Sequence, residues 1–119
     1  MKKVIVIVLL ISVYVAYSGW VYTSGTACNI PMSDAAIQGK LLWQEYNCQN
    51  CHQLYGLGGY MGPDLTTVTT NKQKGILYAR GILLSGGDRM PNFHFSEDEV
   101  NNILAYLSYV SATSVTLTQ

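Results

Sequence analysis

The sequence is poor in side chains that bind metals, with three cysteines and two histidines among its 119 residues. A structural zinc site needs four such ligands. Three of the five lie together at 48, 51 and 52, so only Cys28 and His94 could complete it. The sequence also lacks a strand pattern, and with it the βαβ context of a thioredoxin-like cysteine pair. Zinc and thiol redox sites are therefore the weaker interpretations.

Charge is missing from most of the first quarter of the chain. No charged residue lies between Lys3 and Asp34, and the nineteen residues 4–22 carry none. At about 1.5 Å per residue this run would form a helix about 28 Å long, close to the thickness of a bilayer core. The sequence therefore predicts a transmembrane anchor over residues 1–22.

The residues that flank this run predict its orientation. Lys2 and Lys3 precede it, and Trp20 and Tyr22 stand at its far end as interfacial aromatic residues. This predicts a short N-terminus in the cytoplasm and the rest of the chain in the periplasm of a bacterial inner membrane. The alternative is a cleaved signal peptide, because small residues precede Cys28. Gly25 stands where a lipoprotein cleavage site prefers an apolar residue, so we expect an uncleaved anchor.

Residues 23–32 form a polar linker, and no repeat or low-complexity run indicates a second domain. Residues 33–119 are then expected to form one domain, with its folded part over about 33–110. Fewer than eighty residues make a marginal hydrophobic core unless a metal, disulfide or cofactor is built into it. The domain therefore calls for such a group.

Helical patterns dominate this domain. Apolar spacing predicts helices over 33–47, 74–84 and from Ser96 to at least Leu107, where Ser96 and Glu99 form a capping box. The glycine-rich residues 56–62 are expected to be loop. The predicted fold is small and all-α.

Cys48-Gln49-Asn50-Cys51-His52 is the arrangement that attaches a c-type haem. Its two thiols add to the haem vinyl groups, and its imidazole binds the iron. The sequence therefore predicts one covalently bound haem, which would also complete the small core.

A second axial ligand is needed for a six-coordinate electron carrier, and the choices are Met61, Met90 and His94. Met61 follows His52 too closely to cross to the other side of a haem easily. Met90 comes after a helix and precedes Pro91, which stiffens the loop, so we expect Met90 to bind iron. A packing role for Met90, and a solvated or propionate-side role for His94, are the alternatives.

Two further residues have predicted roles beside the haem. A ligating histidine usually donates its second ring N–H to an acceptor, which the backbone oxygen of Pro63 could provide, although a simple turn proline is the alternative. Arg80 could pair with a haem propionate, but a solvated helix arginine is the favoured interpretation.

The chain resembles a class I cytochrome c domain, and more closely the cytochrome c subunit of bacterial nitric oxide reductase. The resemblance rests on the anchor and on these stretches: Gly39-Lys40-Leu41-Leu42-Trp43, Tyr46 to His52, Leu57 to Leu65, Met90 to Phe93, and Ser96 to Leu107. It implies that the first and last helices of the domain cross, at positions matched by Gly39, Trp43, Ile103 and Tyr106.

The resemblance also implies partners. These are a polytopic catalytic membrane subunit with b-type haems, a soluble periplasmic electron donor, and an interfacial calcium ion contacted at the positions of Gly58 and Tyr60; no nucleic acid is expected. A carbonyl and a phenol are reasonable calcium ligands, but a tyrosine packed on the haem is the alternative. Cys28 matches no family position and is expected to be a free thiol.

The implied function is single-electron transfer to a nitric oxide reductase, with no bond change catalysed by this chain. The alternative is the same role in a haem-copper oxygen reductase, while Met90-Pro91 argues against a gas-binding or peroxidatic cytochrome. The expected periplasmic part carries seven acidic residues against five basic ones, so it would attract a basic donor only weakly. The five are Lys40, Lys72, Lys74, Arg80 and Arg89.

Overall fold

The computed structural model describes residues 2–25 and 30–116, and it divides the chain into two compact units, Met1–Pro31 and Met32–Gln119. Cys28, expected to be a free thiol, lies outside the described residues. The elements in chain order are α1 (Lys2–Gly25), α2 (Asp34–Glu45), η1 (Cys48–Asn50), β1 (Gln53–Leu54), β2 (Leu57–Gly58), η2 (Val68–Thr70), α3 (Ile76–Ser85) and α4 (Glu97–Thr116). The expected all-α class is confirmed, with one very short pair of strands added.

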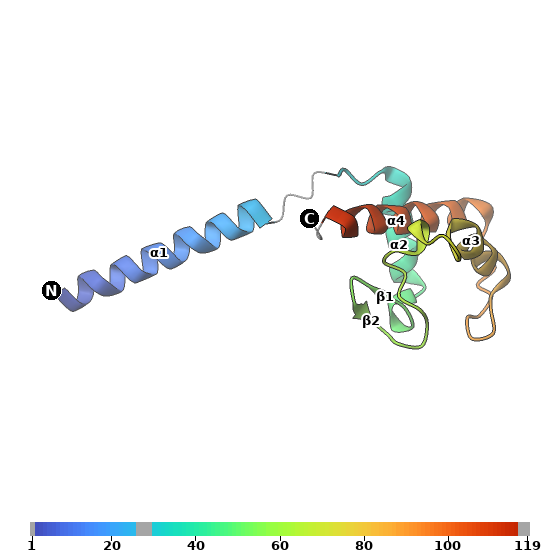
Figure 1. Cartoon of the computed structure of the whole chain (residues 1–119), viewed down its shortest axis with the longest axis horizontal. Helices are drawn as coiled ribbons and strands as arrows, with labels where there is room; N and C mark the ends of the chain where they lie inside the picture. The colour runs from blue at the N-terminus through green and yellow to red at the C-terminus, as the bar shows by residue number, and fades with distance from the viewer. Residues whose placement is uncertain (1, 26–29, 117–119) are drawn as a thin grey trace. The chain divides into compact units, whose positions relative to one another are not determined.

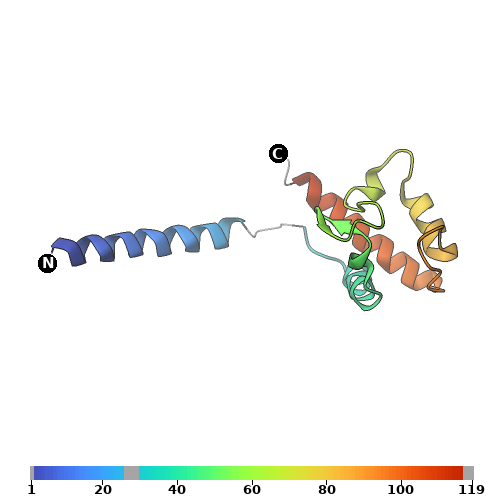
Figure 2. The ribbon, with the colours of Figure 1, turned by 90° about the horizontal axis from the view of Figure 1, so that it is seen from below.

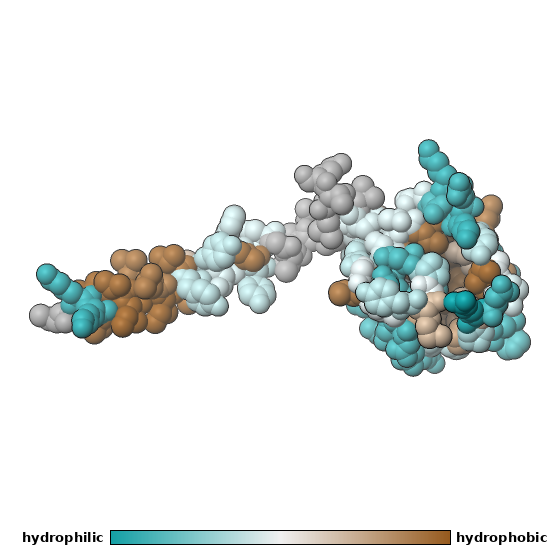
Figure 3. Space-filling model, turned by 60° about the horizontal axis from the view of Figure 1, so that its bottom comes forward, coloured by the Kyte–Doolittle hydropathy of each residue, from teal (hydrophilic) through white to brown (hydrophobic). Residues whose placement is uncertain are grey.

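The first unit is dominated by α1, a continuous helix in Figure 1. Its residues Lys2–Ser24 are long and apolar enough to cross a membrane. On the face shown in Figure 3, hydrophilic residues at its N-terminal end are followed by a stretch of hydrophobic ones. The hydroxyls of Ser12 and Thr23 donate to the carbonyls of Val8 and Gly19 one turn earlier, at 2.8 and 2.9 Å, which satisfies them without water.

Two capped helices begin where the sequence predicts. The Ser33 hydroxyl accepts the N–H of Ala36 at the start of α2. Before α4, the Glu99 carboxylate accepts the Ser96 N–H at 2.8 Å, and the Ser96 hydroxyl accepts the Glu99 N–H at 3.3 Å. Hydrogen bonds from Ser96 lower the pKa of Glu99. The capping box therefore sets both the start of α4 and the charge of its first turn.

Helices α2 and α4 cross in the second unit, as Figures 1 and 2 show. Gly39 makes the close approach possible, because a Cβ on it would lie 1.9 Å from the Asn102 carbonyl oxygen. Next to it, the Trp43 and Tyr106 rings lie 6.1 Å apart. Around this crossing lies the core, which consists of Trp43, Leu83, Phe95, Val100, Ile103, Leu104 and Leu107.

Helix α3 begins later than the expected residue 74. The Asn71 side chain accepts the N–H groups of Gln73 and Lys74 at 2.8 and 3.0 Å, which holds the chain in a turn until Gly75. The helix ends at Gly86, whose φ of 76° suits glycine. From there residues 86–95, here called the Met90 loop, lead to α4.

Candidate haem site

The cysteine motif lies directly after α2. Asn47 leaves the helix with a left-handed φ of 51°, and η1 then brings both cysteines and His52 into about one turn. The N–H of His52 donates to the carbonyl of Cys48 at 2.9 Å. Within the described residues neither thiol of the motif is in a disulfide, and both are half-buried. The motif is thus compact, and both of its thiols are free to form a covalent bond to another group.

Burial raises the pKa of the Cys48 thiol to about 11, and the neighbouring Cys51 adds a smaller increase against a backbone hydrogen bond that lowers it. A redox-active cysteine pair requires the opposite, a lowered pKa that yields a thiolate. Cys48 is therefore a neutral thiol at physiological pH. This disfavours the thioredoxin-like interpretation.

The His52 ring is held by the loop that follows it. Its Nδ1 lies 2.9 Å from the carbonyl oxygen of Pro63, so Nδ1–H donates and Nε2 keeps its lone pair. Gly62 lies against the ring, since a Cβ there would come within 2.4 Å of the ring carbon Cε1. The contact with Pro63 is the one expected from the sequence. That His52 binds iron stays a prediction.

Residues 53–66, here called the hairpin loop, differ from the expected open loop. β1 and β2 pair antiparallel, with Leu54 opposite Leu57, and Tyr55 and Gly56 form the turn between them. Strands of two residues are too short to show the alternation of apolar and polar residues, so the sequence did not predict them. The glycines are needed because the loop packs on the motif: a Cβ on Gly59 would lie 1.8 Å from the Asn50 carbonyl oxygen.

The tip of the hairpin loop presents apolar side chains to solvent. Leu57 is 77% exposed, Tyr60 85% and Met61 68%. We call these three residues the tip patch. Met61 therefore lies away from the core, which weighs against its alternative role as an iron ligand.

Met90 has different surroundings. It is half-buried and packs against the core cluster, and its carbonyl accepts the Gly87 N–H at 2.9 Å. His94 is exposed, with a left-handed φ of 56°. Of the three possible second ligands, Met90 alone packs against the core. Its bond to iron stays a prediction.

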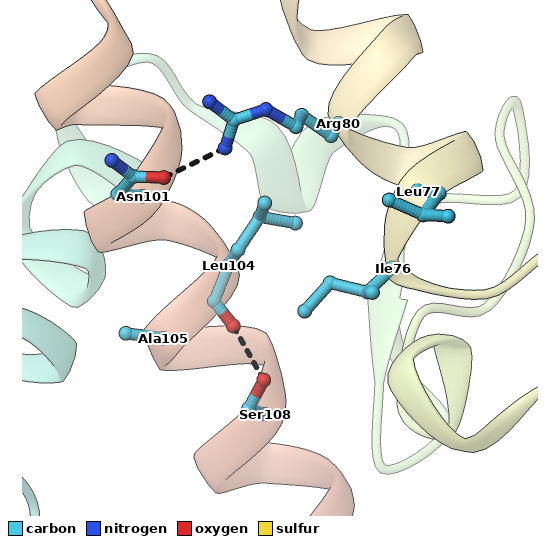
Figure 4. Close-up of a pocket in the computed structure, with 7 residues that line it drawn as sticks. All are labelled: Ile76, Leu77, Arg80, Asn101, Leu104, Ala105 and Ser108. Atoms are coloured by element: carbon cyan, nitrogen blue, oxygen red, sulfur yellow. Dashed lines mark hydrogen bonds between the residues drawn. The ribbon is translucent and has the colours of Figure 1, made fainter.

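Arg80 is not a free solvated side chain. It forms an ion pair with Glu97 and donates to the Asn101 side-chain oxygen at 2.7 Å, so it links α3 to α4. It borders a surface cleft of about 380 Å³, shown in Figure 4. The cleft is lined by Ile76, Leu77, Arg80, Asn101, Leu104, Ala105 and Ser108. It contains no residue of the haem motif.

The residues present fit a haem better than a zinc ion. Nowhere in residues 2–25 and 30–116 do three Cys, His, Asp or Glu side chains gather as a metal site. A c-type haem instead asks for two free thiols, an oriented imidazole and apolar surroundings. The second unit also has half-buried apolar side chains that pack against its core, among them Leu54, Leu65, Val68, Met90 and Phe93, and the thiol Cys48 of the motif packs against the same core.

The family model for "Cytochrome C oxidase, cbb3-type, subunit III" matches residues 34–107, more than half of the chain. The chain belongs to this family. A cytochrome c domain of this family implies a haem cofactor. The match runs from the start of α2 into α4 and includes the motif, the hairpin loop and Met90.

Similar proteins carry a different name, that of the C subunit of nitric oxide reductase. The protein from Halomonas halodenitrificans is 24% identical over 113 residues, which cover 85% of this chain and 75% of the relative. The one from Stutzerimonas stutzeri is 32% identical over 89 residues, covering 67% and 61%. A third, from Cereibacter sphaeroides, is 27% identical over 90 residues, which are 61% of its length. The chain thus spans about three fifths to three quarters of these relatives.

Polar residues late in α4 escaped the sequence analysis. Ser111 and Thr113 are buried, with 1% and 7% of their surfaces exposed, and both are linked to the hairpin loop. A signal was available, because Ser111 continues the apolar spacing of Ile103 and Leu107 at a core position. A polar residue there predicts a buried hydrogen bond.

Proposed function

We propose that this chain is the electron-transfer cytochrome c subunit of a membrane-bound nitric oxide reductase. It accepts single electrons from a periplasmic donor and passes them to a catalytic subunit. The observation that carries the proposal is the His52 ring fixed by Pro63 beside two free, half-buried thiols. The relatives named as the C subunit of nitric oxide reductase support the choice of complex.

The proposal assigns a role to each residue of the site. Cys48 and Cys51 would hold the haem covalently, and His52 and Met90 would bind its iron. When bound, the haem supplies a one-electron iron couple. The Pro63 carbonyl fixes the imidazole tautomer and makes the ring a stronger donor. The residues of the site would hold the haem and orient its histidine ligand, and they catalyse no bond change.

The proposed setting is the bacterial inner membrane. The apolar α1 anchors the chain, with the lysines at its start in the cytoplasm and the cytochrome domain, residues 33–119, in the periplasm. The catalytic partner is a polytopic membrane protein with b-type haems.

The tip patch supports a contact with the partner. Leu57, Tyr60 and Met61 are exposed apolar side chains on a loop that packs directly on the cysteine motif. The interfacial calcium of this proposal lies here, with the Gly58 carbonyl and the Tyr60 phenol as two of its ligands. A structure of the complex with this loop in open solvent would contradict that assignment.

The oxygen-reductase alternative has its own support in the family description, "Cytochrome C oxidase, cbb3-type, subunit III". Metal analysis of the complex purified through this chain separates the two. Non-haem iron with b-type haem supports nitric oxide reductase, whereas copper with haem supports an oxygen reductase. A chain without covalent haem after expression with cytochrome c maturation factors would overturn both.

A further inference from the structure

We propose that Tyr55 and Ser111 are positioning residues that clamp the hairpin loop to α4 and so hold the Pro63 carbonyl on His52. The inference rests on the proposed function, because it concerns the ligand that binds the haem iron. It assigns a role to a polar cluster between the hairpin loop and the end of α4, which the haem motif does not explain. The cluster consists of Tyr55, Thr66, Ser111 and Thr113.

The turn residue Tyr55 is the first observation. Tyr55 and Gly56 both have positive φ, 55° and 75°, as the two central residues of a type I′ hairpin turn require. Asn or Gly occupies the first of these positions at little cost, whereas a bulky residue there is strained. Tyrosine at this position therefore needs a compensating contact.

The phenol of Tyr55 makes that contact on α4. Thr113 has one hydroxyl proton, and the carbonyls of Tyr109 and Val110 accept it at 3.0 Å. The Tyr55 hydroxyl therefore donates, to Thr113 Oγ1 or to the Val110 carbonyl at 3.3 Å. Since Thr113 is nearly fully buried, this bond ties the hairpin turn to the interior of the domain.

Ser111 supplies the second attachment. Its hydroxyl donates to the Thr66 carbonyl at 2.8 Å, and only 1% of Ser111 is exposed. The Thr66 side chain in turn accepts the Tyr55 N–H at 2.7 Å. Both attachments thus meet at Thr66, three residues beyond Pro63. In between, the Leu65 N–H donates to the Gln53 carbonyl at 3.0 Å.

The clamp bears on the His52 ring through Pro63. The Pro63 carbonyl can accept from Nδ1 at 2.9 Å only while the backbone of residues 63–66 keeps its place. A weaker bond leaves the imidazole a poorer donor, which stabilises ferric iron less. Loosening the clamp should therefore raise the reduction potential and expose the Nδ1 proton to exchange.

The test uses the full chain in detergent with haem attached, and compares Tyr55→Phe and Ser111→Ala with the native protein. Ser108→Ala is the matched control, because Ser108 lies one turn before Ser111 and its hydroxyl donates to the Leu104 carbonyl of its own helix. We expect both clamp variants to raise the midpoint potential. Their His52 Nδ1 proton should exchange about fivefold faster by NMR, as for the loss of one hydrogen bond. The control should change neither.

Tyr55→Asn separates the clamp from a simple turn effect. Asparagine relieves the backbone strain, so a residue needed only for the turn would leave the potential and the proton exchange unchanged. That result, or unchanged values in Tyr55→Phe, overturns the proposal. If Ser111→Ala does not fold, Tyr55→Phe decides alone, since it removes one oxygen from a partly exposed side chain. Native protein without covalent haem would instead overturn the proposed function.

Discussion

The two loops that flank the proposed haem are held in different ways. The hairpin loop is fixed by directional hydrogen bonds to the motif and to α4, including Gly62 N–H to the Cys51 carbonyl at 2.7 Å. The Met90 loop packs through aromatic rings. The centroid of the Tyr46 ring lies 5.4 Å from that of Phe93 and 4.7 Å from that of Phe95. Hydrogen bonds fix orientation, whereas aromatic packing fixes mainly proximity. The histidine side should therefore be stiff and the methionine side more adaptable.

The largest effect is expected from Phe95→Ala. Phe95 is 7% exposed and contacts both Tyr46 and Phe93, so its removal leaves a cavity under the Met90 loop. We expect a loss of about 3 kcal/mol in the free energy of unfolding. Denaturant unfolding of the haem-loaded protein measures it. The His52 Nδ1 proton exchange should stay near the native value, and a large increase would show that the two loops are not independent.

A smaller effect is expected from Gly62→Ala on the histidine side. The added Cβ would lie 2.4 Å from the His52 ring and must push the ring or the loop aside. We expect about 2 kcal/mol of destabilisation and a raised reduction potential. Gly87→Ala is the control in the Met90 loop, because the nearest atom to its Cβ would be a flexible Ile82 side chain at 3.5 Å. Equal shifts in both variants would contradict the proposed difference between the loops.

The smallest effect concerns pH. Hydrogen bonds from Ser96 hold the pKa of Glu99 below its ordinary value, so the folded state favours the carboxylate. This stabilisation is fully present above the ordinary glutamate pKa of about 4.3 and is lost as pH falls through the lowered value. We expect Glu99→Gln to flatten the fall in unfolding free energy below about pH 5. An unchanged dependence of the unfolding free energy on pH would show that the Glu99 carboxylate of the capping box does not stabilise the fold.

Helix patterning made much of this fold predictable. The capping box at Ser96 and the N-cap at Ser33 follow from residue types at fixed offsets, and the structure has both. It also has the close helix crossing at Gly39. The crossing was expected through a family resemblance, which the family match now supports.

Other features depend on contacts between distant residues. The strands of the hairpin are too short to show a period, and the clamp joins Tyr55 to Thr113 across 58 positions. Helix α4 continues past Leu107 to Thr116, and in this last part Ser111 and Thr113 are buried and hydrogen-bonded to the hairpin loop. The ligand roles of Cys48, Cys51, His52 and Met90 stay predictions.

The central claim is that His52 and Met90 hold the iron of a covalently attached haem. Ferric haem with a methionine ligand has a weak far-red charge-transfer absorption, and its presence tests the claim most directly. We expect this band in the native protein and in His94→Ala, and its loss, with a lowered potential, in Met90→Ala. A band that survives Met90→Ala, or is absent from the native protein, would contradict the account.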